Sequence, residues 1–253
     1  MVVKSRISSY MPSSTGVARG IHLSKFVPMK IGILIPALNE EKNIEDVLCR
    51  LNDFGFDNVL VIDGQSKDNT IGVARKHGAK VVLQSGKGKG GAIRQVLNNC
   101  DLDVDALVLM DADGSMDPAE IPRFIKALNS GADVVKGSRF MKGGSTFDMD
   151  STRRFGNSML MFVLNFLWSA HYTDLCYGYA VFNKRALEKL APVLESDGFE
   201  IETEIFIKAL DLGLVVKEVP SVEYERKYGV SNLHAMKDGF RILKTIFKEY
   251  LRS

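Results

Sequence analysis

From residue 30 onward, short apolar runs alternate with amphipathic stretches, and this alternation constrains the fold more than any other feature. Runs of this kind are typical of β-strands followed by helices that pack back onto a parallel sheet. The pattern therefore predicts an α/β fold with a mostly parallel sheet flanked by helices. The expected strands are 30–38, 58–63, 79–83, 106–111 and 133–138, and the expected helices between them are 41–52, 70–77, 90–99 and 118–130.

The regular alternation ends near residue 140. Residues 141–152 combine adjacent glycines with small polar residues, so we expect a mobile loop there. Residues 1–28 are rich in Ser and Gly and lack the apolar core of a secretion signal, so we expect a flexible N-terminal extension. The later expected elements are a helix over 153–170, a strand-like stretch over 174–182, a helix over 201–212, a strand over 214–219 and a helix from about Leu233.

Charge and cysteine usage narrow the functional classes. The 33 basic and 31 acidic residues leave a net charge of +2, which provides no overall field for nucleic acid. The three cysteines lie far apart without a CxxC spacing, which disfavours a disulfide framework or a structural zinc site and indicates a reducing cytosol. The longest apolar run, 159–168, is about half of the ~20 residues that cross a bilayer. We therefore expect a cytoplasmic protein whose membrane contact, where it exists, is peripheral and on the cytosolic face.

Acidic side chains follow three of the expected strands, at the edge where open α/β sheets bind ligands. Glu40 follows the first strand and Asp63 ends the second, while Asp111 and Asp113 lie at the end of the fourth. On an extended chain Asp111 and Asp113 leave the same face, where their charges repel unless a cation lies between them. Oxygen ligands without His or Cys suit Mg²⁺ or Mn²⁺ bound together with substrate phosphates. For Asp63 alone, a helix cap or an Asx turn is the competing interpretation.

The segment SGKGKGGAIR, residues 85–94, lies between the third expected strand and the next helix. Its glycines let backbone N–H groups approach an anion, and three cations lie near the helix start, so the segment predicts contact with phosphate. Gly86, Gly88 and Gly91 also fit GxGxxG, with Asp111 twenty residues further on, as in a dinucleotide-binding oxidoreductase. That fingerprint normally occupies the first turn after a strand, whereas two strands precede this one. A solvated surface turn is the remaining interpretation.

The sequence resembles the inverting family 2 glycosyltransferases in five segments that occur in the right order: PALNEEKNI, VIDGQSKDNT, GKGGAIRQ, DADGSMDP and KGSRF. The likeness continues through TDLCYGYAVFNKRAL and GFEIETEIFIKAL to EVPSVEYERKYGVSNL and DGFRIL, and it is nearest to the dolichyl-phosphate mannose synthase-like branch. The resemblance implies a GT-A fold, which is Rossmann-like and typical of nucleotide-diphospho-sugar transferases. It also implies one domain over 29–253, with a nucleotide-sugar half at about 29–140 and an acceptor half at about 141–253.

The resemblance also implies the roles of individual residues. Asp111 and Asp113 match the metal-binding DxD motif, with Asp113 as the direct ligand and Asp111 as a ribose contact or second ligand. The chain departs from the branch at Gly114 and the two residues after it, where a metal-assisting amide is missing, and at Asn232, where a lysine is missing. The missing lysine puts mannose in doubt. The implied nucleotide contacts are Pro36, Leu38, Glu40, Asp63, Lys89 and Arg94, and Arg139 of the GSR motif is implied near the sugar or the acceptor.

The implied reaction moves a sugar from a UDP- or GDP-sugar to a polyprenyl phosphate such as dolichyl phosphate. A divalent cation and neighbouring basic groups stabilise the charge that develops on the departing diphosphate. A phosphate acceptor is already charged and needs basic groups to position it, whereas a hydroxyl acceptor needs a carboxylate base. The candidates for positioning a phosphate are Arg153, Arg154, Arg226, Lys227 and Ser231, and the candidate bases are Asp174, Glu202 and Glu204.

Three functional alternatives remain open at this stage. The acceptor is either a lipid phosphate or a hydroxyl group, and the third alternative is a nucleotide-binding module without catalysis. Glu202 and Glu204 also fit the role of solvated acids near a helix start.

Two apolar stretches favour a lipid-linked acceptor. The run 159–168 follows Arg153 and Arg154 directly, as in a helix that lies in a membrane interface. In the last expected helix an apolar stripe runs beside a basic one. The competing interpretation is that both helices simply pack on their own domain. The apolar stripe consists of Met236, Phe240, Leu243 and Phe247, and the basic one of Lys237, Arg241, Lys244 and Lys248.

Overall fold

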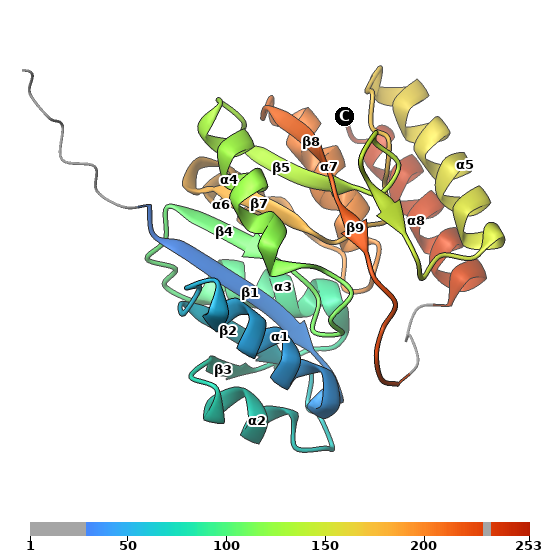
Figure 1. Cartoon of the computed structure of the whole chain (residues 1–253). Helices are drawn as coiled ribbons and strands as arrows, with labels where there is room; N and C mark the ends of the chain where they lie inside the picture. The colour runs from blue at the N-terminus through green and yellow to red at the C-terminus, as the bar shows by residue number, and fades with distance from the viewer. Residues whose placement is uncertain (1–28, 230–233) are drawn as a thin grey trace, which may run out of the picture.

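A seven-stranded sheet forms the centre of the computed structural model, which describes residues 29–229 and 234–253 (Figure 1). The strand order is β3-β2-β1-β4-β7-β5-β8. Neighbouring strands are parallel except at β7, which runs antiparallel to both β4 and β5. The strands are β1 (Ile31–Ala37), β2 (Val59–Asp63), β3 (Lys80–Leu83), β4 (Ala106–Leu109), β5 (Val134–Ser138), β7 (Ala180–Asn183) and β8 (Val216–Pro220).

Helices cover both faces of this sheet and bury a separate apolar core on each. Side chains alternate along β1, so that Ile33 and Ile35 face one core while Leu34 faces the other. The first core lies under α1 (Glu41–Asp53), α2 (Thr70–Lys76) and α4 (Ile121–Asn129). The second lies under α3 (Gly88–Asn99), α5 (Ser151–Trp168), α6 (Lys184–Leu190), α7 (Ile201–Asp211) and α8 (Ala235–Tyr250). Short 3₁₀ turns at Pro118–Glu120 and Ala191–Val193 precede α4 and follow α6.

Every strand and helix expected before residue 140 is present, with ends shifted by a few residues. One shift affects the acidic motif, because β4 ends at Leu109 and leaves Asp111 and Asp113 in the following turn rather than on an extended strand. The strand-like stretch 174–182 narrows to β7, and the expected C-terminal helix begins at Ala235. The helix α6 was not predicted from the sequence. The predicted extension, residues 1–28, lies outside the described residues.

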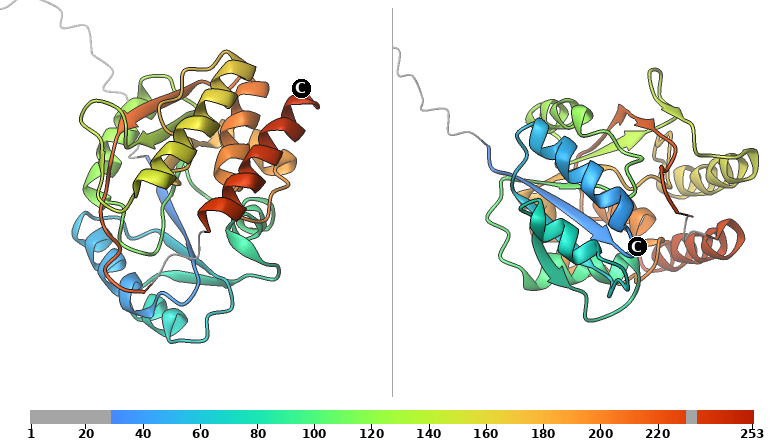
Figure 2. Two further views of the ribbon diagram at one scale, coloured as in Figure 1. Left: turned by 90° about the vertical axis from the view of Figure 1, so that its right-hand side faces the viewer. Right: turned by 60° about the horizontal axis from the view of Figure 1, so that its bottom comes forward.

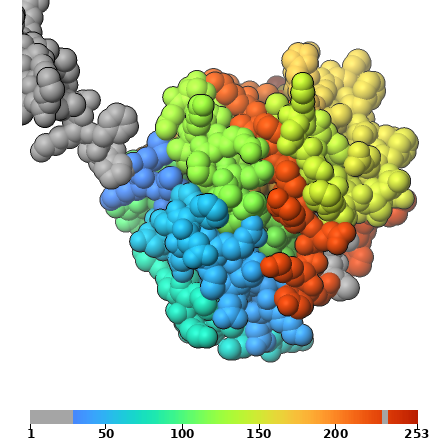
Figure 3. All heavy atoms as spheres, viewed as in Figure 1, coloured from blue at the N-terminus to red at the C-terminus, as the bar shows by residue number. Residues whose placement is uncertain are grey.

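The expected loop 141–152 contains a short strand, which pairs with a second short strand much later in the sequence. β6 (Ser145–Thr146) runs parallel to β9 (Val222–Glu223) in a separate two-stranded sheet. A pairing of two residues at this separation leaves no periodic signal in the sequence. The segment after β9 lies beside the turns that follow β1 and β4, because Arg226 contacts both Glu40 and Asp113. Figure 3 shows orange-red atoms lying against blue ones on this face.

Candidate active site

Hydrogen bonds of Asn39 and Ser66, two residues that were not predicted as site residues, join the turns after β1 and β2. Asp63 is buried and accepts hydrogen bonds from the backbone N–H of Ser66 at 2.8 Å and from the Ser66 hydroxyl at 2.6 Å. These contacts are those of an Asx turn, which was the alternative to a nucleotide contact for this residue. The Ser66 hydroxyl accepts the N–H of Asn39 at 2.8 Å. Asn39 and Gln65 have φ values of 56° and 67°, which are uncommon for residues other than glycine. Such backbone strain clusters at ligand sites, and it is a signal that sequence alone does not carry.

The other predicted nucleotide contacts line the same edge of the sheet. Pro36 lies near the end of β1, Leu38 is 42% exposed, and Glu40 is buried. Burial raises the pKa of Glu40, although hydrogen bonds from Asn43 and Arg226 act in the opposite direction. The edge therefore presents an apolar side chain and a shielded carboxylate next to the acidic turn.

Asp111 is neutralised by a buried lysine. The Lys89 Nζ lies 2.5 Å from Oδ1 of Asp111 and 2.6 Å from Oε1 of Glu202, and only 8% of the Lys89 side chain is exposed. Burial disfavours its charge, but the two carboxylates outweigh burial and raise the pKa of Lys89. Burial and the nearby Asp111 raise the pKa of Glu202, although Lys89 opposes both effects. This cluster joins α3, α7 and the turn after β4, so it brings three predicted site residues together.

Asp113 is neutralised from another element. Its Oδ1 accepts hydrogen bonds from the backbone N–H and hydroxyl of Ser115, at 3.0 and 2.7 Å. Its Oδ2 accepts from Nη2 of Arg226 at 3.1 Å, and Nη1 of Arg226 lies 2.8 Å from Oε1 of Glu40. Gly114, directly after Asp113, has a φ of 80°, which suits the left-handed turn that follows the acidic pair. The acidic pair thus has two different cations beside it, both supplied by parts of the chain distant in sequence.

The donor set fits a divalent cation that takes further ligands from a substrate. Asp111 and Asp113 keep 28% and 18% of their side chains exposed, and both carboxylates already attract positive groups. Across residues 29–229 and 234–253 no group of three or more metal-binding side chains occurs. Two carboxylates are enough for Mg²⁺ or Mn²⁺ when phosphate oxygens and water complete the coordination. Asp113 and Asp111 are the residues that would hold such an ion.

The glycines of the segment 85–94 pack closely against a neighbouring loop, and this packing positions Lys89. A Cβ atom on Gly88 would overlap the backbone of Asp197, and one on Gly90 would overlap that of Ser196. The N–H of Gly91 is donated to the carbonyl of Asp197 at 3.1 Å. The glycines thus allow a close contact with the 195–198 loop that was not predicted, and the contact of this segment with phosphate stays a prediction. Arg94, a predicted nucleotide contact, donates to the Asp197 carboxylate at 2.7 Å.

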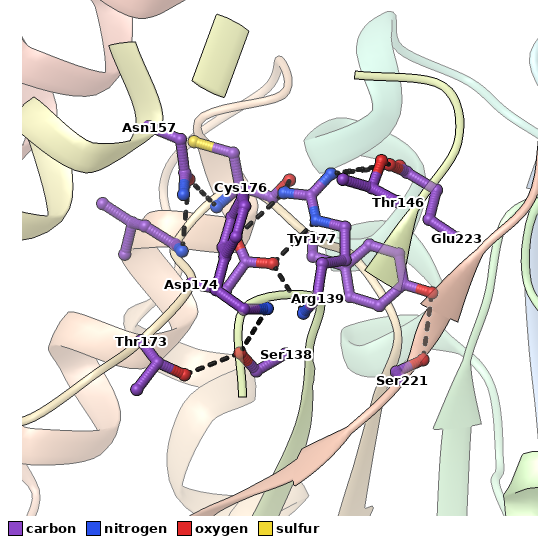
Figure 4. A network of polar contacts seen from close by, with 12 residues as sticks. Ser138, Arg139, Thr146, Asn157, Thr173, Asp174, Cys176, Tyr177, Ser221 and Glu223 are labelled. Carbon is purple, nitrogen blue, oxygen red and sulfur yellow. Dashed lines mark hydrogen bonds and ion pairs between the residues drawn. The ribbon is translucent and has the colours of Figure 1, made fainter. Parts of the chain in front are cut away.

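Arg139, which follows β5 at the same carboxyl edge of the sheet, forms a buried ion pair with Asp174 (Figure 4). Nε and Nη2 of Arg139 donate to the two Asp174 oxygens at 2.7 and 2.9 Å, and Nη1 lies 3.0 Å from Glu223. Burial acts to raise the pKa of Asp174, but the hydrogen bonds and charge of Arg139 outweigh it and lower that pKa. The charges of Arg139 and Asp174 therefore compensate each other, and the contact of Arg139 with Glu223 links the end of β5 to β9.

Glu204 lies apart from the acidic cluster. Its buried carboxylate accepts the backbone N–H groups of Glu195 and Ser196 at 2.9 and 2.8 Å. It holds the loop against which the glycines of α3 pack. Of the three predicted bases, only Glu202 contacts a residue of the cluster around Asp111.

The chain matches the model of Glycosyl transferase family 2 over residues 32–191, more than half of its length. It belongs to that family. A glycosyltransferase named AglJ from Haloferax volcanii is 34% identical over 87% of this chain and 72% of its own. The UDP-N-acetylglucosamine--dolichyl-phosphate N-acetylglucosaminyltransferase of Methanococcus voltae is 30% identical over 84% of this chain and 92% of its own.

The fold of this family 2 glycosyltransferase is GT-A. Glucosyl-3-phosphoglycerate synthase from Mycobacterium tuberculosis, solved with Mn²⁺ and UDP, superimposes with a TM-score of 0.69 at 22% identity over 87% of this chain and 80% of that one. Family membership confirms the resemblance and the enzyme class, and it disfavours both the oxidoreductase and the module without catalysis.

The predicted phosphate-binding cations of the glycosyltransferase differ in their surroundings. Only Arg226 contacts the acidic pair. Arg153 pairs with Asp148 at 3.2 Å, and Lys227 pairs with Asp46 at 3.0 Å. The Arg154 guanidinium lies 5.3 Å from the centre of the Phe140 ring. Ser231, the fifth predicted acceptor contact, lies outside the described residues.

An apolar face of the glycosyltransferase is exposed on α5, which packs beside α8 at one end of the molecule (Figure 2). Leu160 and Leu164 bury the inner side of α5, so the helix contributes to the core on one side only. Within the described residues no helix is long and apolar enough to cross a membrane. The exposed apolar side chains are Phe155, Met159, Phe162 and Phe166 on α5, and Met236, Phe240 and Phe247 on α8.

Proposed function

We propose that this enzyme transfers a sugar, with inversion, from a UDP- or GDP-sugar to a polyprenyl phosphate, with Mg²⁺ or Mn²⁺ bound at the acidic pair. The relative from Methanococcus voltae, named for transfer to dolichyl phosphate, supports this acceptor class. The acidic pair and Lys89 lie at the carboxyl end of the sheet, where ligands of α/β folds bind.

The donor side needs positive charge where the diphosphate departs. A divalent cation bound to Asp111 and Asp113 supplies charge stabilisation for the leaving group. Lys89 holds Asp111 in one position and, through Glu202, fixes it against α7. The strained turns at Asn39 and Gln65 shape the neighbouring surface, which supports a nucleoside site beside Leu38.

One observation carries the choice of acceptor: each of the three predicted bases is already engaged. Asp174 faces Arg139, Glu202 faces Lys89, and Glu204 accepts two backbone N–H groups. To act as a base for a hydroxyl acceptor, each of these carboxylates would have to give up a contact that it makes in the structure. A phosphate acceptor carries its own negative charge and needs no base.

The exposed face of α5 and α8 supports a lipid-linked acceptor. Phe162 and Phe166 expose 70% and 76% of their surface, and Lys237, Lys244 and Lys248 lie on the same helix as Phe240. Apolar side chains flanked by basic ones suit a helix that lies in an anionic membrane interface. We therefore place the enzyme peripherally on the cytosolic face, in keeping with its free cysteines.

Transfer of radiolabelled sugar tests the proposal. We would offer UDP-glucose, UDP-N-acetylglucosamine and GDP-mannose with dolichyl phosphate, with dolichol, or with a soluble glycan, each with Mn²⁺ or EDTA. We expect a metal-dependent product with dolichyl phosphate only. Product with dolichol or the glycan would instead establish the hydroxyl-acceptor alternative, and lack of product with every pair would reject the proposal.

A further inference from the structure

A short segment after β9, which we call the strap (residues 224–229), lies across the proposed donor site (Figure 3). Its first residue, Tyr224, donates its N–H to the carbonyl of Ser115 at 2.8 Å, beside the acidic turn. Tyr228 exchanges two hydrogen bonds with the side chain of Asn43 on α1, at 3.2 and 3.0 Å. The strap is therefore fastened at both ends to the part of the chain that the nucleotide is proposed to contact.

Arg226 is the central fastening of the strap. Its guanidinium spans Glu40 and Asp113, with N–O distances of 2.8 and 3.1 Å. Asp113 Oδ1 is already bonded to Ser115, so Arg226 takes the remaining oxygen. Burial opposes the charge on Arg226, but Asp113 and Glu40 outweigh it and raise its pKa, so the guanidinium stays charged.

Ser115 holds one oxygen of Asp113 and Arg226 holds the other, so a divalent cation that binds Asp113 meets the guanidinium at the oxygen it needs, and the two positive groups repel each other. We propose that Arg226 and the divalent cation compete for Asp113, so that the strap is latched in the empty enzyme and released when metal and nucleotide bind. This inference rests on the proposed metal-dependent donor site. Release of the strap leaves Arg226 free at the edge of the site.

The latch lowers the apparent affinity for the donor. If only a fraction f of the protein can bind the donor, the apparent dissociation constant rises by a factor of 1/f. A strap that is latched nine-tenths of the time therefore raises it about tenfold. Removal of the guanidinium should recover this loss. Arg226→Gln keeps a polar side chain of similar reach and removes the competing charge. Lys227→Gln is the matched control, because Lys227 lies next to Arg226 but pairs with Asp46, at an exposed position where an ion pair contributes little.

Calorimetry of Mn²⁺ with UDP and hydrogen–deuterium exchange of the strap test the inference on the full chain. We expect Arg226→Gln to bind Mn²⁺ and UDP about tenfold more tightly than wild type, and Lys227→Gln to bind like wild type. In wild type, Mn²⁺ with UDP should speed exchange at the Tyr224 and Tyr228 amides, whose hydrogen bonds fasten the strap.

The outcomes separate the latch from the proposed function. If wild type binds Mn²⁺ with UDP and Arg226→Gln binds them equally or more weakly, the latch is overturned. Slower exchange in the strap on binding would overturn it as well. Either result leaves the proposed donor site unaffected. Lack of binding of Mn²⁺ with UDP to all three proteins, together with lack of binding of Mn²⁺ with GDP, would overturn both.

Discussion

Lys89 is a buried cation between two carboxylates, and neither carboxylate is stable there without it. We expect Lys89→Met to lower the free energy of unfolding by about 3–5 kcal/mol, because it leaves Asp111 and Glu202 uncompensated in a shielded place. Urea unfolding measures this loss. The double variant Lys89→Met with Glu202→Gln should recover part of it, with a coupling energy of about 0.5–3 kcal/mol. Strictly additive losses would contradict the shared cluster.

The Arg139–Asp174 pair predicts how stability responds to acid. Asp174→Asn should cost about 3–5 kcal/mol at pH 7, because Arg139 keeps a buried charge with a weaker partner. The folded pKa of Asp174 is lowered, so its contribution is full above the unfolded value of about 3.9 and is lost as the pH falls toward the folded value. The gap between wild type and Asp174→Asn in urea unfolding should therefore narrow between about pH 4 and pH 2.

An exposed ion pair provides the control for this prediction. Asp197 pairs with Arg94 but is 74% exposed, so Asp197→Asn should cost less than about 1 kcal/mol. A similar loss of unfolding free energy in Asp174→Asn and Asp197→Asn would show that burial does not cause the larger loss expected for Asp174→Asn.

At the scale of elements, the start of α3 depends on how closely the 195–198 loop approaches it. Gly90→Ala should lower the free energy of unfolding by about 1–3 kcal/mol, since the added methyl group overlaps the Ser196 backbone. Gly86 lies in the same segment with open space around its Cβ position and serves as the matched control. Thermal unfolding should separate the two variants clearly. Equal melting temperatures would mean that the loop yields without cost.

Substitutions on the outer face of α5 should weaken membrane binding without lowering the stability of the fold. Phe162→Ser with Phe166→Ser should reduce cosedimentation with anionic vesicles several-fold, because both rings are exposed and contribute little to the core. Phe54→Ser removes an exposed ring near the end of α1, on the other face of the sheet, and should not change vesicle binding. Equal vesicle binding in all three proteins would remove the membrane role of α5.

The elements that could be predicted are those whose sequence pattern lies within the element itself. The strands and helices before residue 140 carry strong period-2 and period-3.6 patterns, and they lie close to their expected positions. β6 and β9 have two residues each and are defined only by pairing with each other. α6 has seven residues and directly follows β7, so no loop signal separates them.

For the molecule as a whole, the edge of the site was predictable but its connections were not. Asp111, Asp113 and Lys89 were singled out because parallel strands and the turns after them meet at one edge. The contact of Arg226 with Asp113 joins residues 113 positions apart, and that of Lys89 with Glu202 joins residues 113 apart as well. Such partners depend on the tertiary fold, and no spacing rule in a single sequence reveals them.

The position of β7 between β4 and β5 has a consequence for biosynthesis. When the ribosome has produced the first 140 residues, β4 and β5 exist but lack the strand that joins them. Each then presents an unpaired edge that invites association with other nascent chains. β4 and β5 are joined only after residue 183 has emerged, and the sheet is complete only after β8, which ends at Pro220. The N-terminal part is therefore expected to need shielding by chaperones during synthesis.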